Sequence, residues 1–144
     1  MASPTSYIGA VIAVSVATPA TIDSSGFGAL SYTTVGKIVS WGAVGDTSDN
    51  IAIPLLAGRV EHVNGAADGG EIPFVVRYDS DAGQTLLVNN SNNNVTVSVK
   101  ITDPDGKLAY FYGIVANIQD QERNNSNFKG LTGVFRVNSA TVRV

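Results

Sequence analysis

Several residue types that build functional sites are missing or rare in this chain of 144 residues. It contains no cysteine, one histidine (His62), one tryptophan and one methionine. The absence of cysteine excludes disulfides and thiolate metal sites, and a single histidine excludes any two-histidine metal motif. Charged residues make up only 15% of the chain, with a formal net charge of −3. They are scattered and form no basic block of the kind that binds nucleic acid or a membrane surface.

Long hydrophobic runs are also missing. The longest apolar stretch near the start, residues 8–17, alternates like a strand and follows no charged segment. It is too short to cross a bilayer. We therefore expect no signal peptide, no transmembrane segment and no membrane partner, and we expect the chain to be made in a cytoplasm.

The abundant residues favour a β protein. Val, Thr, Ile, Ser, Asn and Gly dominate the chain, whereas the helix formers Leu, Lys, Glu and Gln are sparse, which predicts an all-β fold with many turns. We predict a single domain over residues 1–144, since no repeat or linker divides the chain. Mean hydropathy is +0.13 despite the many small polar residues. This value favours a surface that self-assembly covers over a merely Val- and Ala-rich core.

Alternation of apolar and polar residues predicts most of the strands. The pattern indicates strands at residues 12–16, 33–43, 59–63, 71–78, 95–101, 107–118 and 131–144. The second of these has possible bulges at Gly36 and Gly42, and the last has a break near Ser139 and Ala140. Residues 103–106, Asp-Pro-Asp-Gly, predict a tight turn between two antiparallel strands. Residues 23–28 and 64–70 are expected to be turn-rich connections.

One short helix is expected at residues 82–88. Asp79, Ser80 and Asp81 precede it and can cap its first turn with side-chain oxygens and negative charge. Leu86 and Leu87 would dock this helix on the sheet. The asparagine-rich run at residues 89–94 is expected to end the helix and form a loop.

The stretch TSDNIAIPLLAGRVEHV, residues 47–63, places large aliphatic side chains where a loop is expected. Pro54 would break a helix and cannot donate to a sheet ladder, so we expect an extended loop at about residues 46–58 that does not pair as an ordinary strand. Gly58 would let the chain turn back. Contact with another subunit is favoured over a loop folded onto its own core. The expected interface residues are Asp49, Ile51, Ile53, Pro54, Leu55, Leu56 and Arg59.

Catalytic and ligand-binding patterns are weak. His62 is next to Glu61, but neighbouring residues of a strand point to opposite faces, and no G-x-S-x-G motif is present. The Asp103–Gly106 turn lacks the further acidic ligands of a calcium loop, and residues 65–70 lack the phosphate-loop pattern. We therefore predict no catalytic residue, cofactor or metal site. A binding module and a structural assembly protein remain.

The order of features resembles the major tail tube proteins of long, flexible-tailed (siphovirus-type) bacteriophages. The resemblance rests on residues 14–21, 23–30 and 32–38, on Gly58-Arg59-Val60, on the turn at 68–72, on the capped helix at 79–87, and on the Pro104-Asp105-Gly106 hairpin leading to Tyr110-Phe111-Tyr112. It spans nearly the whole chain in the right order.

This resemblance implies a fold and an assembly. The expected fold is a β-sandwich or partial barrel with one flanking helix, which joins sheets with its neighbours in a hexameric ring. Rings would stack into a hollow tube, the virion's conduit for genomic double-stranded DNA, which passes without sequence-specific binding. The tape measure protein, the tail-tip initiator and the tail terminator are the other implied partners. Ile51–Leu56 would contact either the same ring or the next one.

Other functions remain open at this point. A tail terminator, a capsid decoration protein or a type VI secretion-like tube protein could share the fold. A carbohydrate- or peptide-binding β-sandwich is a more remote alternative, because it would need an exposed aromatic platform and a secretion signal.

Overall fold

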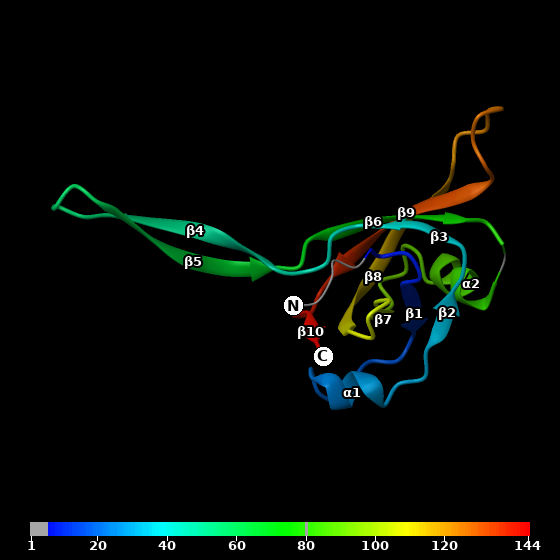
Figure 1. Cartoon of the computed structure of the whole chain (residues 1–144), viewed down its shortest axis with the longest axis horizontal. Coiled ribbons are helices and arrows are strands. Elements are labelled where there is room, and N and C mark those ends of the chain that lie inside the picture. The colour runs from blue at the N-terminus through cyan, green and yellow to red at the C-terminus, as the bar shows by residue number, and fades with distance from the viewer. Residues whose placement is uncertain (1–5, 80) are drawn as a thin grey trace.

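The computed structural model describes residues 6–79 and 81–144, and Figure 1 shows their arrangement. This part of the chain forms ten strands and two short helices. In chain order they are β1 (Val11–Ser15), α1 (Ser24–Gly28), β2 (Thr33–Val35), β3 (Ile38–Trp41), β4 (Thr47–Pro54), β5 (Val60–Asp68), β6 (Glu71–Arg77), α2 (Ala82–Asn89), β7 (Val97–Thr102), β8 (Leu108–Asp120), β9 (Gly130–Val137) and β10 (Val142–Arg143).

One large antiparallel sheet forms the body of the molecule. Its strand order is β2-β1-β7-β8-β9-β6-β3, with β10 also paired to β8. The 13-residue strand β8 pairs with β7 through its first half and with β9 through its second half. The two ends of this path, β2 and β3, are consecutive in the chain. The sheet therefore curls round on itself as a partial barrel, as expected.

Alternating side chains fill the inside of this curled sheet. Ile72, Phe74 and Val76 of β6 are almost fully buried, in line with their shared parity. Phe111 of β8 meets Phe135 of β9 edge to face, with ring centroids 5.4 Å apart. The aliphatic residues of β1 and β7 complete the core: Ile12, Val14, Val97, Val99 and Ile101.

Helix α2 lies at the corner between β2 and β3 and packs Leu87 into the core. Asp81 is its N-cap: one carboxylate oxygen accepts from the Gln84 backbone N–H and the other from the Gly36 N–H, each at 2.8 Å. A Cβ on Gly83 would approach the Thr34 carbonyl oxygen to 2.4 Å, so glycine permits this close packing. Asp79 is not the cap, and Ser80 lies outside the described residues.

The structure corrects two expectations about the body. Residues 33–43 form two strands, not one, because the chain turns at Gly36 and Lys37, where Lys37 has φ 59°. A second helix, α1, replaces part of the connection expected at 23–28. Asp23 caps α1 by accepting from the Gly26 N–H at 2.7 Å, and Phe27 is buried with its ring stacked on Tyr110.

Candidate assembly site

Strands β4 and β5 form a separate two-stranded sheet that projects far from the body (Figure 1). We call residues 47–68 the arm. The strands of the arm make their main contacts with each other. The expected loop at about 46–58 and the short strand at 59–63 are therefore wrong in detail: the chain forms a long hairpin that includes most of the turn region expected at 64–70.

The tip of the arm is a tight turn that its sequence supports. Gly58 N–H donates to the Leu55 carbonyl at 3.0 Å, and Leu55 N–H donates to the Arg59 carbonyl at 2.9 Å. Gly58 has φ +92°, in the left-handed region that a three-residue hairpin loop requires at its last position. The expected role of Gly58 in turning the chain back is confirmed.

Pro54 pairs with Val60 as the last residue of β4, although we expected it to prevent pairing. The physical reason is that backbone N–H groups along a strand point alternately toward the partner strand and away from it. Because the Leu55 N–H points inward to Arg59, the nitrogen of the preceding residue lies on the outer edge of the hairpin. A missing N–H leaves no ladder bond unmade at that edge.

Cross-strand register sorts the arm into two faces. Ile51 is opposite Val63 and Ile53 is opposite Glu61, so these side chains share one face with Leu55 and Arg59. We call this the apolar face of the arm. The opposite face carries Asn50, Ala52, Pro54, Val60, His62 and Asn64. On it, His62 Nδ1 lies 2.9 Å from Asn50 Oδ1.

The expected interface residues all lie on the arm, and their side chains are exposed to solvent. Ile51, Ile53 and Leu55 are 50%, 41% and 38% exposed, and Leu56 at the tip is fully exposed. The alternative that this segment fills its own core is therefore wrong. Pro54 points away from the apolar face, and Asp49 sits at a bulge between Ser48 and Asn50. Contact with another subunit remains a prediction.

Sequence reasoning missed Val60 and Val63, which are also exposed on the arm. Val63 extends the apolar face on β5, directly opposite Ile51. The sequence could have indicated Val63 only through its position opposite Ile51 in the hairpin. That position is known only once the pairing register of the two strands is known.

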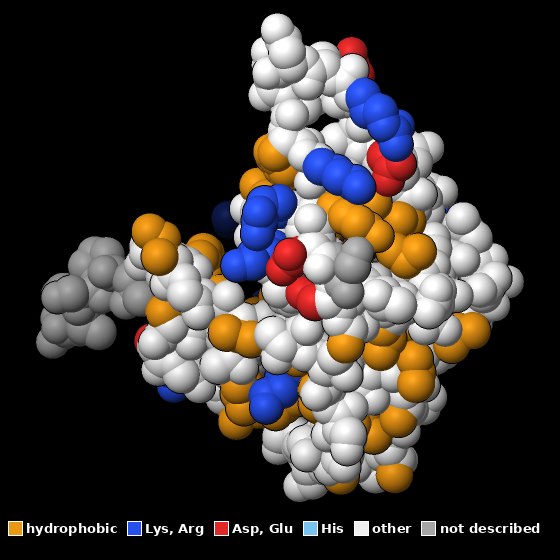
Figure 2. All heavy atoms as spheres, turned by 90° about the vertical axis from the view of Figure 1, so that its right-hand side faces the viewer, with side chains coloured by type: hydrophobic (Ala, Val, Ile, Leu, Met, Phe, Trp, Pro, Cys, Tyr) orange, Lys and Arg blue, Asp and Glu red, His pale blue; other side chains and the backbone are white. Residues whose placement is uncertain are grey.

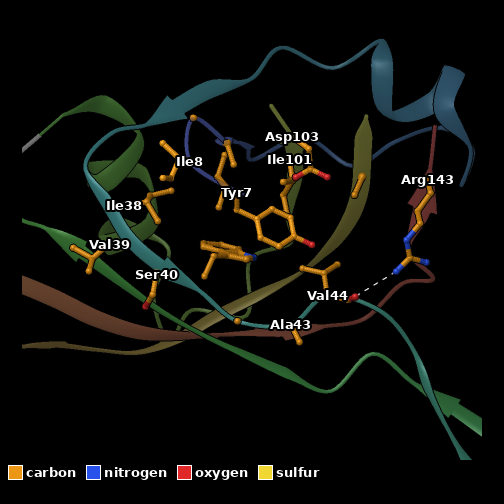
Figure 3. A pocket seen from close by; sticks show the side chains of 16 residues that line it. Tyr7, Ile8, Ile38, Val39, Ser40, Ala43, Val44, Ile101, Asp103 and Arg143 are labelled. Carbon is orange, nitrogen blue, oxygen red and sulfur yellow. Dashed lines mark hydrogen bonds between the residues drawn. The ribbon is translucent and has the colours of Figure 1, made fainter. Parts of the chain in front are cut away.

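An open groove of about 850 Å³ lies at the base of the arm (Figure 3). Its walls come from three places: the segment 7–10 before β1, the edge strand β3 with the residues up to Val44, and the strands around Ile101 and Arg143. The lining is mostly apolar, and its charged residues are Asp103 and Arg143. Arg143 Nη2 donates to the Val44 carbonyl at 3.3 Å, as the dashed line in Figure 3 marks.

The described residues offer little for catalysis. They contain no group of three or more His, Cys, Asp or Glu side chains that could hold a metal ion. Residues 103–106 form the expected turn, with the Gly106 N–H donating to the Asp103 carbonyl at 2.9 Å. His62 faces Ala52 while Glu61 faces Ile53, so the two do not meet. No helix within residues 6–79 and 81–144 is long and apolar enough to cross a membrane.

Among the described residues, the pKa values of Asp23 and Tyr32 are shifted, and both shifts have structural causes. The Gly26 N–H and the Thr21 hydroxyl donate to Asp23 and lower the pKa of that carboxyl. Burial, with a smaller contribution from Tyr110, raises the pKa of Tyr32 to about 12. The Tyr32 hydroxyl donates to the Phe27 carbonyl at 2.8 Å. Both groups hold α1 in place, so neither marks a reactive site.

Charge on the end of the body opposite the arm is mixed. Figure 2 shows lysine and arginine side chains gathered in the upper part of this view with aspartate and glutamate among them. Among the described residues, Arg123 pairs with Asp120 at 2.8 Å, and Arg136 pairs with Glu71 at 3.0 Å near the base of the arm. This mixed face does not form the one-signed patch that binds a phosphate backbone.

A similar fold is found in several solved structures. A chain from the sheath/tube terminator of an extracellular contractile injection system, PVC, matches with a TM-score of 0.68 at 7% identity, over 99% of this chain and 98% of that one. A chain of the SPP1 tail tube matches with a TM-score of 0.67 at 9% identity, over 97% and 78%. A chain of the anti-feeding prophage (AFP) baseplate matches with a TM-score of 0.66 at 7% identity, over 100% and 97%.

No protein-family model and no curated protein sequence matches the chain. The structural matches nevertheless agree with one another, because each comes from a phage tail or a related injection apparatus. The chain therefore has a tail-tube fold. The expected fold class, all-β with a short helix on a partial barrel, is confirmed, with α1 as the addition.

Proposed function

We propose that this protein is the major tail tube subunit of a siphovirus-type phage, which assembles in the host cytoplasm into stacked hexameric rings. The stacked rings form the virion's conduit for genomic double-stranded DNA. The observation that carries this proposal is the arm, an exposed apolar hairpin on a tail-tube fold that has no partner within the described chain. Isolated two-stranded hairpins are marginally stable in water, so this arm is built for a neighbour.

The open sheet edges support the same proposal. Among the described strands, β2 and β3 each pair with one neighbour, which leaves each with an open edge there. Free edges are an aggregation hazard for a monomer, and joining them between subunits in a closed ring removes that hazard. Stacking of rings is a head-to-tail contact that propagates a filament. The tape measure protein, the tail-tip initiator and the tail terminator are the further partners of such a tube. No enzymatic activity is part of this proposal.

A tail or tube terminator is the second candidate. The match to a chain of the PVC sheath/tube terminator, which covers almost the whole of both chains, favours it specifically. A terminator forms a single ring that ends a tube. The number of rings in the assembly therefore separates the two functions.

Negative-stain electron microscopy of the purified protein at high concentration tests the proposal. We expect hexameric rings that stack into hollow tubes, either alone or after addition of a tail-tip initiator complex. Single rings that never stack would support the terminator instead. A chain that stays monomeric at high concentration and also in the presence of the initiator would overturn both.

A further inference from the structure

We infer that one extra residue in β3, Val39, keeps free copies of this chain from pairing with one another through the open edge of that strand. This protection acts on the subunit before any ring exists. It therefore goes beyond the proposed function and does not depend on what the subunit later forms.

Strand β3 contains one residue more than its partner β6 can match. Ile38 is opposite Val76 and Ser40 is opposite Val75, which leaves Val39 without a partner of its own. This arrangement is a β-bulge, which bends a strand and increases its local twist. The extra residue lies in the middle of the edge strand, where a second strand would have to pair.

The hydrogen bonds at the two ends of β3 show which backbone groups face outward. The Lys37 carbonyl accepts from β6 at 2.8 Å, and the Gly42 N–H donates to the Pro73 carbonyl of β6 at 2.8 Å. Residues of an antiparallel ladder alternate between facing the partner strand and facing away from it. Ile38, next to Lys37, and Trp41, next to Gly42, therefore present their N–H and C=O groups at the open edge.

These two outward-facing residues, Ile38 and Trp41, are three positions apart. A regular strand presents its outward groups at every second residue. An incoming strand that bonds to Ile38 is therefore out of step by the time it reaches Trp41. A bulge of this kind on an edge strand is one of the features by which natural sheets avoid edge-to-edge aggregation.

The core holds the bulge in place. Ile38 and Trp41 both pack against the core, and the Trp41 ring stacks on Phe74 with centroids 5.1 Å apart. Residues three apart on a regular strand point to opposite faces, so both can face the core only if an extra residue lies between them. Figure 3 shows the side chain of Ile38 directed to the inside of the curled sheet, and those of Val39 and Ser40 directed away from it. Losing the bulge by a register slip would take Trp41 out of the core.

The open edge at the other end of the sheet is protected by its length. Among the described strands, β2 ends the sheet there with three residues, Thr33–Val35, and α2 packs against it at Gly83. A very short edge strand offers little to an incoming strand. The ladder of β3, in contrast, runs from Lys37 to Gly42. It is long enough to receive a second strand, so the bulge is its protection.

Deletion of Val39 tests this role, because it removes the bulge and keeps the core. Ile38 and Trp41 then lie two positions apart, so both still face the core while the open edge becomes regular. We expect the purified deletion variant to self-associate in sedimentation velocity, with a dissociation constant about tenfold below that of the wild type. The matched control is Val39→Ser, which also removes the valine side chain but keeps the extra residue. It should behave as the wild type does.

A single cysteine reports whether two β3 edges meet. The chain contains no cysteine of its own, and Ser40 is exposed in the middle of β3. In the deletion variant, two antiparallel copies of β3 bring their Ser40→Cys side chains opposite each other, within bonding reach. Mild oxidation should therefore give disulfide dimers when Val39 is deleted, and few when it is present.

The fluorescence of Trp41, the single tryptophan of the chain, shows whether the deletion variant keeps this ring in the core. A deletion variant that unfolds, or that stays as monomeric as Val39→Ser, would overturn the inference. So would association without crosslinking through Ser40→Cys, because the contact would then lie elsewhere. Association with this crosslink would support the inference even if the wild-type chain never forms a ring, a failure that removes only the proposed function.

Discussion

At the scale of single residues, the buried side chain of Gln84 makes three hydrogen bonds to backbone groups. It is buried on α2, its Oε1 accepts from the Asp79 N–H at 2.9 Å, and its Nε2 donates to the carbonyls of Gly36 and Arg77 at 2.8 and 2.9 Å. One side chain therefore joins the corner after β2, the end of β6 and the start of α2. Sequence reasoning did not single it out, because one partner, Gly36, is 48 residues away in the chain and the other two are backbone groups before the helix.

Replacing Gln84 with leucine should destabilise the fold by about 3 kcal/mol, because it leaves three backbone groups without their hydrogen-bond partner. Urea unfolding followed by circular dichroism measures this loss. Gln119→Leu on β8, where the native residue is exposed, serves as the matched control and should change the free energy of unfolding by less than about 0.5 kcal/mol. Equal effects of the two changes would contradict the role assigned to Gln84.

Tyr32 gives the fold a sensitivity to alkaline pH. Burial raises its pKa to about 12, whereas an unfolded tyrosine titrates near pH 10. The unfolded state therefore loses its proton first, and stability that is complete below pH 10 declines as the pH rises towards 12.

The measurement for this prediction is the free energy of unfolding between pH 9 and 12. We expect a shallower decline for Tyr32→Phe than for the wild type, since phenylalanine has no proton to lose. Tyr7→Phe, a change at a largely exposed residue, should decline as the wild type does. If all three curves coincide, Tyr32 does not control this part of the pH profile.

At the scale of elements, the sequence predicted strands and the capped helix well, because these depend on local alternation and on one N-cap residue. Asp81, the strands around Phe74, Val99 and Phe111, and the break near Ser139 are examples. It failed at the arm. Whether Pro54 can belong to a strand depends on which edge of the hairpin its nitrogen faces. The turn at Gly58 and the register with β5 set that edge. Register is a property of two segments together, so neither segment alone indicates it.

The arm should be needed for assembly but not for folding. Ile53→Asp with Leu55→Asp places two charges on the apolar face, where they meet water in the free subunit and a neighbour in the assembly. We expect unfolding free energy within about 0.5 kcal/mol of the wild type, because both side chains are exposed. We expect electron microscopy to show no rings or tubes.

The control for this prediction uses the same chemistry elsewhere. Val16→Asp with Ile22→Asp charges two exposed aliphatic positions outside the arm and the groove, and this variant should assemble. An unfolded arm variant would show instead that the hairpin supports the body, against the contacts described above.

At the scale of the whole molecule, the sparse charge fits the DNA conduit that we propose. A wall rich in lysine and arginine would hold DNA by releasing counterions from its phosphates. Arg136 is already paired with Glu71 at 3.0 Å. The net charge of −3 adds no general attraction for DNA.

If the proposed tubes form, they should therefore not retain duplex DNA. In an electrophoretic mobility assay at physiological salt, we expect linear double-stranded DNA to migrate unchanged in the presence of tubes. A tube preparation carrying Glu71→Gln, which frees the Arg136 charge, is the comparison that reports any weak attraction. Retention by wild-type tubes that disappears at high salt would contradict a passive conduit.

The tight turn at the tip of the arm also sets how vulnerable the subunit is before it assembles. Leu56 is fully exposed on a short loop, and exposed loop tips are where proteases cut first. Chymotrypsin should nick the free subunit next to Leu55 or Leu56 and leave the body intact, whereas an arm seated on a neighbour should resist. The ratio of nicked to whole chain would then measure the fraction of free subunits in a mixture, and a protease that cuts the arm would remove free subunits from the proposed assembly.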